Sequence, residues 1–293
     1  MLCGYGQHSP NEPGLFWLGS KVSDGMNSPD LPVISARLVI HDLASVRNSA
    51  EGAVFIVASG QSVQGFPIER FVDVPMITMN GAINKFVGTP VVPYFYVCTD
   101  SSFPLQQPRL FGQALLLSQR IALWPEQLAT LPVVPAGELF ALSKAVDGGR
   151  VRSLLKPGGR LVRSRALWQK RSRSLGFSKD LSHGFFDART VAYVALQLAY
   201  HLGFSQVFLV GVDLQEAAGR FYEREGGVRS PCGLDEHYRR RILPSLKLMA
   251  RRVVGAGFEV YNLSECSRVP ASVIPRAGIG DVRGIIAEHG GRR

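Results

Sequence analysis

Residues 187–222 constrain the fold most strongly, because they read as a helix, a tight turn, a strand and a polar loop. Most positions from 191 to 202 are apolar, which indicates a helix buried against a sheet, and Thr190 is placed to cap its first turn. Gly203 then ends the helix, and the all-apolar residues 207–210 are typical of a strand covered on both faces. A helix followed by such a strand predicts an α/β protein with a parallel sheet.

Three earlier apolar runs each end at a cluster of small polar residues. Residues 53–58 precede the sequence SGQS, residues 76–79 precede Asn80 and Gly81, and residues 94–98 precede the sequence TDSS. Because the carboxyl ends of parallel strands meet at one edge of a sheet, these loops and the loop after residue 210 are predicted to converge. The sequence therefore predicts an α/β fold, a Rossmann-like and mostly parallel sheet with helices on both faces. Further strands are expected at residues 131–134 and 258–261, and a helix at residues 235–254.

The chain is strongly basic, with a formal net charge of +10. This charge predicts an anionic partner. Residues 148–179 contain ten Lys or Arg and no acid, and they indicate a basic insertion or lid within residues 105–182. Leucines alternate with these charges, which favours an anionic membrane surface over nucleic acid, although a solvated basic loop is an alternative. The predicted organisation is an irregular amino-terminal arm, residues 1–30, and a single α/β domain, residues 31–293.

The remaining composition favours a cytoplasmic protein. Four cysteines are scattered without a C-x-x-C pair, which predicts neither a zinc site nor a disulfide framework. No signal-peptide pattern opens the sequence, and no run of about 18 apolar residues could span a membrane. We expect a cytoplasmic protein that can associate peripherally with a membrane; no sequence feature predicts an oligomeric state.

Candidate ligand-binding residues follow the first three strands. Gly60 would let the backbone approach a ligand, and the Ser62 hydroxyl could bind a phosphate or a ribose. Asn80 with Gly81 could hydrogen-bond a base or a sugar, or form only a turn. Asp100 could bind a ligand hydroxyl, act as a general base, or cap a helix.

The loop after residue 210 supplies groups that suit a phosphate. Asp213, Arg220 and Tyr222 follow this strand; an arginine binds phosphate in a fork, and a tyrosine hydroxyl donates to a phosphate oxygen, although an ordinary surface salt bridge is the alternative. No D-x-D pair follows any predicted strand, so no metal site is predicted. His183 and His237 are candidate general bases, against the more common structural role of a single histidine.

Several segments together resemble a known family. They are FIVASGQS, MNGA, VVPYFYVCTDSSF, LGFSKDLSHGFFDARTVAYVALQLAY, GVDLQEAAGRFYE, ILPSLKLM and VYNLS, and they cover about half the chain in the same order. The sequence resembles the bacterial lipopolysaccharide inner-core transferases that add a further Kdo (3-deoxy-manno-octulosonic acid) residue. It is also similar to the CMP-sialic acid-dependent bacterial sialyltransferases.

The resemblance implies a function and a set of residue roles. The enzyme would be an inverting, metal-independent glycosyltransferase with a sialyltransferase-like GT-A fold, with CMP-Kdo as donor, Kdo-lipid A as acceptor and no cofactor. It implies catalytic roles for His237 and Tyr222, and the position of Asp100 after its strand makes Asp100 a further catalytic candidate. The resemblance implies nucleotide binding by Gly60, Ser62, Asn80, Arg189 and Thr190. The loop positions of Gly81, Asp213 and Arg220 make them further candidates for nucleotide binding. Leu214 and Gln215 stand where the sialyltransferases have a further tyrosine.

Three alternatives fit parts of the same pattern. The donor could be CMP-sialic acid. A pterin diphosphokinase-like enzyme shares a G-x-x-S turn and a G-x-D-L strand end, but it would need carboxylates for magnesium. A protein without catalytic activity that binds acidic glycans or nucleic acid would also be basic.

Overall fold

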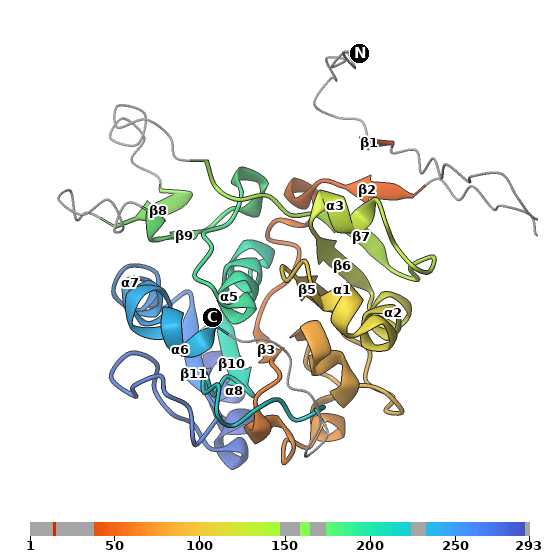
Figure 1. Cartoon of the computed structure of the whole chain (residues 1–293). Helices are drawn as coiled ribbons and strands as arrows, with labels where there is room; N and C mark the ends of the chain where they lie inside the picture. Colours follow the sequence, from red (N-terminus) through yellow and green to blue (C-terminus); the bar gives the residue numbers. More distant parts are fainter. Residues whose placement is uncertain (1–13, 16–37, 147–158, 165–173, 224–232, 291–293) are drawn as a thin grey trace, which may run out of the picture.

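A nearly parallel sheet of nine strands forms the centre of the molecule (Figure 1). The computed structural model describes residues 14–15, 38–146, 159–164, 174–223 and 233–290. The strand order is β1-β2-β7-β6-β5-β4-β3-β10-β11, and only the two-residue β1 pairs antiparallel. The bounds are β1 Gly14–Leu15, β2 Val39–His41, β3 Ala53–Val57, β4 Met76–Met79, β5 Phe95–Cys98, β6 Arg120–Leu123, β7 Glu138–Ala141, β10 Gln206–Val210 and β11 Glu259–Asn262.

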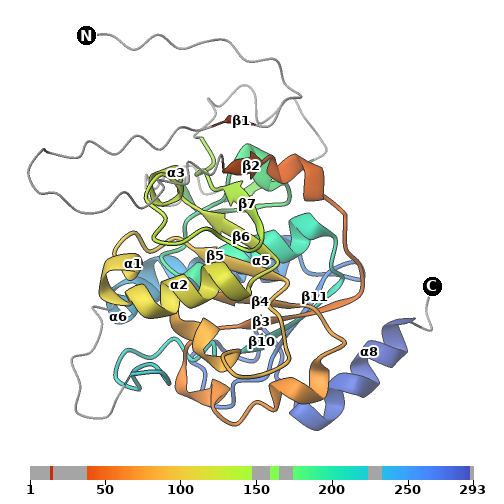
Figure 2. The same cartoon turned by 90° about the vertical axis from the view of Figure 1, so that its right-hand side faces the viewer.

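Helices cover both faces of the sheet, as the sequence predicts. On one face, α5 (Val191–Leu202) and α7 (Leu243–Arg252) share a core with alternate strand residues such as Val54 and Ile56. On the other face, α2 (Pro108–Leu117) and α8 (Val282–Gly290) pack with the intervening residues, such as Phe55. The short helices are α1 (Phe103–Gln106), α3 (Pro125–Leu128) and α6 (Leu234–His237). Figure 2, turned by 90°, shows α1 and α2 in front of the strands.

The chain order reverses between β3 and β10. Strands β4 to β7 lie on one side of β3, whereas β10 and β11 lie on the other side, with Val207 of β10 paired in parallel with Val54 of β3. In open α/β sheets this reversal leaves a crevice at the carboxyl ends of the strands, where ligands bind. The predicted convergence of loops therefore falls at the place where such sheets bind their ligands.

Some predicted elements are wrong or displaced. Residues 131–134 form no strand, because Pro132 lies among them, Pro135 follows them, and Val133 and Val134 are exposed. The sheet instead uses β6 and β7, which lie inside residues 105–182, so this range is not one insertion outside the sheet. The helix expected at residues 235–254 runs through α6, a π-helical turn at Tyr238–Ile242 and α7.

The basic part of the predicted insertion is described only in part. A separate antiparallel pair joins β8 (Leu161–Arg163) to β9 (Gly176–Ser178). Residues 147–158 and 165–173, which hold most of the basic cluster, lie outside the described residues, as does the amino-terminal arm apart from β1. No helix in the part of the chain that the structure describes is long and apolar enough to cross a membrane.

Helix α5 is almost completely buried, and its polar side chains hold the segment that precedes it. The Gln197 amide oxygen accepts from the N–H groups of Ser178 and Phe186, at 2.9 Å each. The Tyr193 hydroxyl lies 2.8 Å from the carbonyl oxygen of Gly176. Because a buried polar group without a partner costs about 1–3 kcal/mol, these bonds fix residues 176–186 against the helix.

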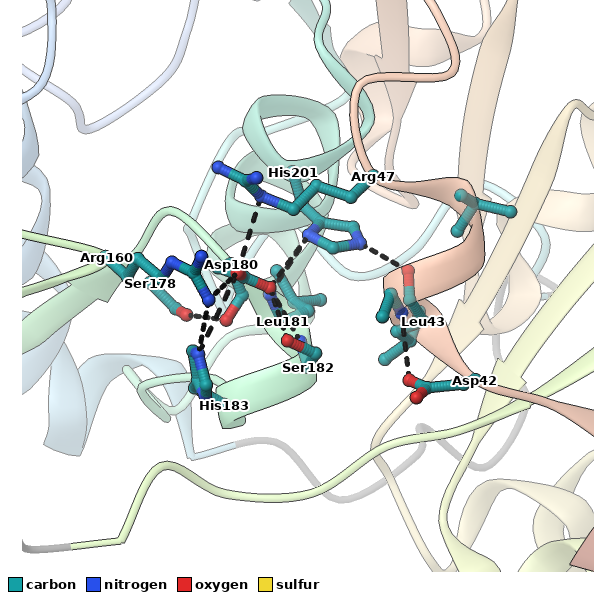
Figure 3. Close-up of polar contacts among 12 residues, drawn as sticks. Asp42, Leu43, Arg47, Arg160, Ser178, Asp180, Leu181, Ser182, His183 and His201 are labelled. Atoms are coloured by element: carbon teal, nitrogen blue, oxygen red, sulfur yellow. Dashed lines mark hydrogen bonds and ion pairs between the residues drawn. The ribbon is translucent and has the colours of Figure 1, made fainter. Parts of the chain in front are cut away.

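His201, at the end of α5, sits in a buried polar cluster with Asp180 (Figure 3). Its Nε2 donates to the carbonyl oxygen of Leu43 at 2.8 Å, and its Nδ1 accepts from the N–H of Leu181 at 3.1 Å. These two bonds require the neutral imidazole. Burial lowers the pKa of His201, although the nearby Asp180 carboxylate favours its charged form.

We expect the burial of His201 to make the free energy of unfolding depend on pH. As pH falls below about 6.5, the unfolded chain binds a proton at residue 201 that the folded chain does not, so stability falls, by at most about 1.4 kcal/mol per pH unit. The pKa of Asp180 is also lowered, but a carboxyl group titrates below this range. Urea unfolding of wild type and His201→Gln at pH 7.5 and 5.5 measures the difference.

The half-exposed His183 is the matched control for this prediction. His183→Gln should keep the pH dependence of the wild type, whereas His201→Gln should weaken it. Equal pH dependence in His201→Gln and wild type would contradict the assignment of a neutral, buried imidazole.

Candidate active site

A cleft of about 1020 Å³ lies at the carboxyl ends of the central strands. The loops after β3, β4, β5 and β10, the start of α5 and the helix α6 all contribute to it. Eight of the predicted site residues line this cleft: Gly60, Asn80, Asp100, Arg189, Thr190, Asp213, Arg220 and His237. The other three do not line the cleft but adjoin residues that do. Ser62 bonds Asp213, Gly81 follows Asn80, and Tyr222 lies against Gly81. The structure thus brings the predicted residues to one place.

The carboxylate of Asp213 joins the loops that follow β3 and β10. Its Oδ2 accepts from the backbone N–H of Ser62 at 3.0 Å, and its Oδ1 accepts from the Ser62 hydroxyl. A Cβ atom at Gly60 would lie 2.5 Å from Asp213 Oδ2, so residue 60 has to be glycine. Asp213 and Gly60 therefore fix the shape of the turn at one wall of the cleft.

The polar loop after β10 folds back over the same turn. Arg220 forms an isolated antiparallel bridge with Gly60, and the N–H of Phe221 donates to the carbonyl oxygen of Ser59 at 3.2 Å. The Arg220 guanidinium lies 3.3 Å from a carboxylate oxygen of Glu223, so it forms the salt bridge that was the alternative to a ligand-binding role. Arg220 also lines the cleft, so its position is compatible with both roles.

Tyr222 packs against the backbone that follows β4. A Cβ atom at Gly81 would lie 2.2 Å from two ring carbons of Tyr222, so glycine at residue 81 makes room for the ring. Burial raises the pKa of Tyr222 to about 12, with the Arg220 charge opposing the rise. The phenol therefore stays protonated at neutral pH and keeps a hydrogen to donate.

Asn80 has a side chain suited to a ligand. Its Oδ1 atom is buried and has no hydrogen-bond partner among the described residues. Its backbone is left-handed, with φ of 43°. Among the described residues, three of the four non-glycine residues with positive φ line this cleft: Asn80, Arg189 and Leu214. Such conformations cost free energy and concentrate at functional sites.

The start of α5 opens onto the cleft. Thr190 is the N-cap residue, as predicted, but its side chain accepts no capping hydrogen bond, so that part of the prediction is wrong. Val191 and Ala192, in the first turn, also line the cleft. The free N–H groups and the dipole of a twelve-residue helix favour an anion at this end.

The loop after β5 is held by residues that the sequence analysis did not single out. Asp100 Oδ1 accepts from the N–H and the hydroxyl of Ser102, while the Gln127 amide donates to the Asp100 carbonyl oxygen at 3.1 Å. Trp124 Nε1 donates to the carbonyl oxygen of Thr99 at 2.9 Å. Trp124 follows β6, which was not predicted, although the apolar run before it could have indicated a strand end.

A second cleft of about 500 Å³ adjoins the first and shares with it Lys144, Asp187, Arg189 and His237. Between the two, Asp187 Oδ1 accepts from the N–H of Arg189 at 2.8 Å, and Lys144 Nζ lies 3.1 Å from Asp187 Oδ2. Burial works against the Asp187 charge, but these two groups hold the pKa of the carboxyl below its usual range. Asp187 and Lys144 are thus site residues that the sequence analysis missed.

The two candidate histidines have different positions. His237, on α6, lines both clefts. His183 lines neither; its ring lies 3.0 Å from Arg160, in the cluster around Asp180. Of the two histidines, only His237 therefore remains a candidate base. Within the described ranges, no three or more His, Cys, Asp or Glu residues are grouped so that they could hold a metal ion.

A mostly parallel α/β sheet with a cleft at its switch point defines the class of protein, a Rossmann-like α/β protein. Residues 161–278 match the family model described as 3-deoxy-D-manno-octulosonic acid transferase WaaZ. A "probable 3-deoxy-manno-octulosonic acid transferase" of Escherichia coli (strain K12) is 26% identical over 252 residues, covering 81% of this chain and 86% of the relative. The protein of the same description from Salmonella typhimurium (strain LT2) is 24% identical over 250 residues, covering 78% and 87%. The predicted resemblance to the Kdo transferase family is therefore confirmed.

A solved structure, that of the MAf glycosyltransferase from Magnetospirillum magneticum AMB-1, is similar with a TM-score of 0.41 and 13% identity. The match covers 85% of this chain, which spans only 40% of that protein.

We expect Gly81→Ala to destabilise the fold, because the new methyl group would overlap the Tyr222 ring. Overpacking of this kind typically costs about 1–3 kcal/mol. Gly65→Ala is the matched control, since a Cβ atom at residue 65 meets nothing within 4 Å. Urea unfolding of both variants measures the difference, and a Gly81→Ala protein as stable as Gly65→Ala would contradict the close contact.

Proposed function

We propose that this protein is a glycosyltransferase that transfers Kdo from CMP-Kdo to the Kdo-lipid A inner core of lipopolysaccharide. The observation that carries the proposal is a single cleft in which the loops after β3, β4, β5 and β10 meet the start of α5. Similarity to proteins described as Kdo transferases supports the donor sugar and the acceptor class. The net charge of +10 suits an anionic acceptor at a membrane surface.

The nucleotide would bind between the turn at Gly60 and the start of α5. The unpartnered Asn80 Oδ1 suits a donor group of the nucleotide, such as an amino group or a ribose hydroxyl. The first turn of α5, with the uncommitted Thr190 hydroxyl, suits the phosphate.

Charge develops on the CMP phosphate as the bond to Kdo breaks. Arg220 and the protonated Tyr222 would stabilise this charge in place of a metal ion. A preorganised donor aimed at a developing charge is worth about 3–4 kcal/mol. We infer that transfer proceeds with inversion and without a metal, so no cofactor beyond the donor is required.

The acceptor hydroxyl has to lose a proton when it attacks the sugar. His237 is the proposed general base because it lines both clefts, and Asp100, which also lines the larger cleft, would orient the reacting groups. A positioned general base typically contributes about a hundredfold or more in rate.

The proposal predicts nucleotide binding and a defined product. CMP at roughly one hundred times its Kd should stabilise the protein by about 2.7 kcal/mol in a thermal unfolding assay, and ATP should not. Incubation with CMP-Kdo and Kdo-lipid A should add the mass of one Kdo, with equal rates in EDTA and in magnesium. A product formed only from CMP-sialic acid would identify the rival donor, and activity lost in EDTA and restored by magnesium would contradict metal independence.

We expect Tyr222→Phe to lower kcat by roughly a hundredfold, because it removes one donor to the departing phosphate. The ring against Gly81 is retained, so the unfolding midpoint should change little. Tyr261→Phe, on β11 and outside both clefts, is the control. Unchanged turnover in Tyr222→Phe would exclude the hydroxyl from the reaction.

His237→Gln should lower kcat by about a hundredfold or more, with little change in CMP affinity. His183→Gln, outside both clefts, should keep the wild-type kcat. A large loss in Asp100→Asn with none in His237→Gln would move the role of base to Asp100.

A further inference from the structure

We propose that the second cleft binds the carboxylate of the acceptor sugar, and that Arg240 together with Arg189 is the anion-binding pair. This inference rests on the proposed function and names the part of the site that selects the acceptor. The cleft adjoins the larger one and shares four lining residues with it, so a molecule in it would face the donor cleft.

Two arginines at the cleft have no hydrogen-bond or ion-pair partner for their side chains among the described residues. Lys144 is paired with the Asp187 carboxylate at 3.1 Å. The Arg241 guanidinium donates to the carbonyl oxygen of Asp187 at 2.9 and 3.1 Å and to Ser174, so its donors already bind the backbone of these two residues. Arg189 and Arg240 form no side-chain hydrogen bond or ion pair with any other described residue.

Neither acidic residue at the cleft forms a hydrogen bond or an ion pair with the side chain of either arginine, and the Arg189 charge acts on the Asp187 carboxylate only through space. Asp187 is already bonded by Lys144 and by the N–H of Arg189. Glu236 also lines the cleft, but among the described residues it makes no ion pair with either arginine. Because an arginine binds a carboxylate in a bidentate fork, two unpaired arginines at one cleft suit an acidic sugar.

Local backbone geometry places both arginines at the cleft. Arg189 is held in a left-handed conformation, with φ of 65°, by the turn that the Asp187 carboxylate closes. Arg240 lies in the π-helical turn Tyr238–Ile242, which brings it and the adjacent Arg241 to the same cleft. Turns of this kind often occur at functional sites.

His237 connects the anion site to the reaction. It lines both clefts, one turn before Arg240 in the chain. A sugar whose carboxylate binds Arg189 and Arg240 would therefore have its hydroxyl groups near the proposed base. The buried rings of Phe185 and Phe186 form an apolar wall on the same cleft.

The test compares Arg240→Ala with Arg239→Ala. Both residues are exposed and adjacent in the chain, but only Arg240 lines the cleft. With Kdo-lipid A as acceptor, Arg240→Ala should lower kcat/KM for the acceptor by about tenfold or more, since a hydrogen bond between charged groups is lost. The KM for CMP-Kdo should not change, and Arg239→Ala should stay within about twofold of wild type.

A ligand pair tests the carboxylate directly. NMR titration with the methyl glycoside of Kdo should show binding to wild type and to Arg239→Ala, and much weaker binding to Arg240→Ala. The methyl ester of the same glycoside should bind weakly to all three. Equal binding of acid and ester, or equal behaviour of the two variants, would overturn the inference. Inorganic phosphate that binds more tightly than the glycoside, through Arg240, would assign the cleft to a phosphate group instead.

The two proposals fail in different ways. If wild type neither binds CMP nor adds Kdo, the proposed function is wrong, and the NMR titration still decides whether Arg240 binds an acidic sugar. If wild type transfers Kdo and Arg240→Ala has the same acceptor KM as Arg239→Ala, only the acceptor site is wrong.

Discussion

The contact between Asp213 and Ser62 is the interaction on which the cleft depends. It joins residues 151 positions apart, at the carboxyl ends of two neighbouring strands, β3 and β10, where the sheet reverses its order. Glycine at residue 60 lets the carboxylate approach, and the loop that carries Arg220 then folds over the same turn. The Asp213 carboxylate therefore binds the backbone of the turn, and the shape of this wall of the cleft depends on it. Losing it would leave the Ser62 N–H without this acceptor, at a cost of about 1–3 kcal/mol.

A second set of buried hydrogen bonds positions the segment that leads to the second cleft. Tyr193, Gln197 and His201 lie on one helix, and each bonds the backbone of residues 176–186. That segment leads into Asp187 and Arg189, which separate the two clefts. The three polar residues of this nearly all-apolar helix are thus explained by their hydrogen bonds to residues 176–186. A fully apolar α5 would pack against the sheet and leave that segment without its anchors.

The sequence was sufficient for the central strands and for the loops that follow them. Runs such as residues 53–58 and 207–210 are buried on both faces, so their apolar character is continuous and their ends are distinct. The prediction failed where this signal weakens, because β6 begins with Arg120 and β7 with Glu138. Residues 131–134 lie instead in a loop, with Pro132 among them and Pro135 after them. Two of the site residues missed, Trp124 and Lys144, follow those two strands. Contacts such as Gly81 with Tyr222 depend on tertiary packing and have no local signature in the sequence.

The left-handed residues around the larger cleft have a consequence for engineering the protein. Asn tolerates this conformation, but Arg189 and Leu214 hold it at a cost on the order of 1–3 kcal/mol each. These residues at the rim of the cleft therefore lower the stability of the fold while they keep the geometry of the rim fixed. Glycine at residue 214 would relieve the strain without adding atoms to the cleft, but the loop would become less rigid. Heat-tolerant forms that retain turnover are better sought away from this rim, at surface positions such as Gly65 that have space for a side chain.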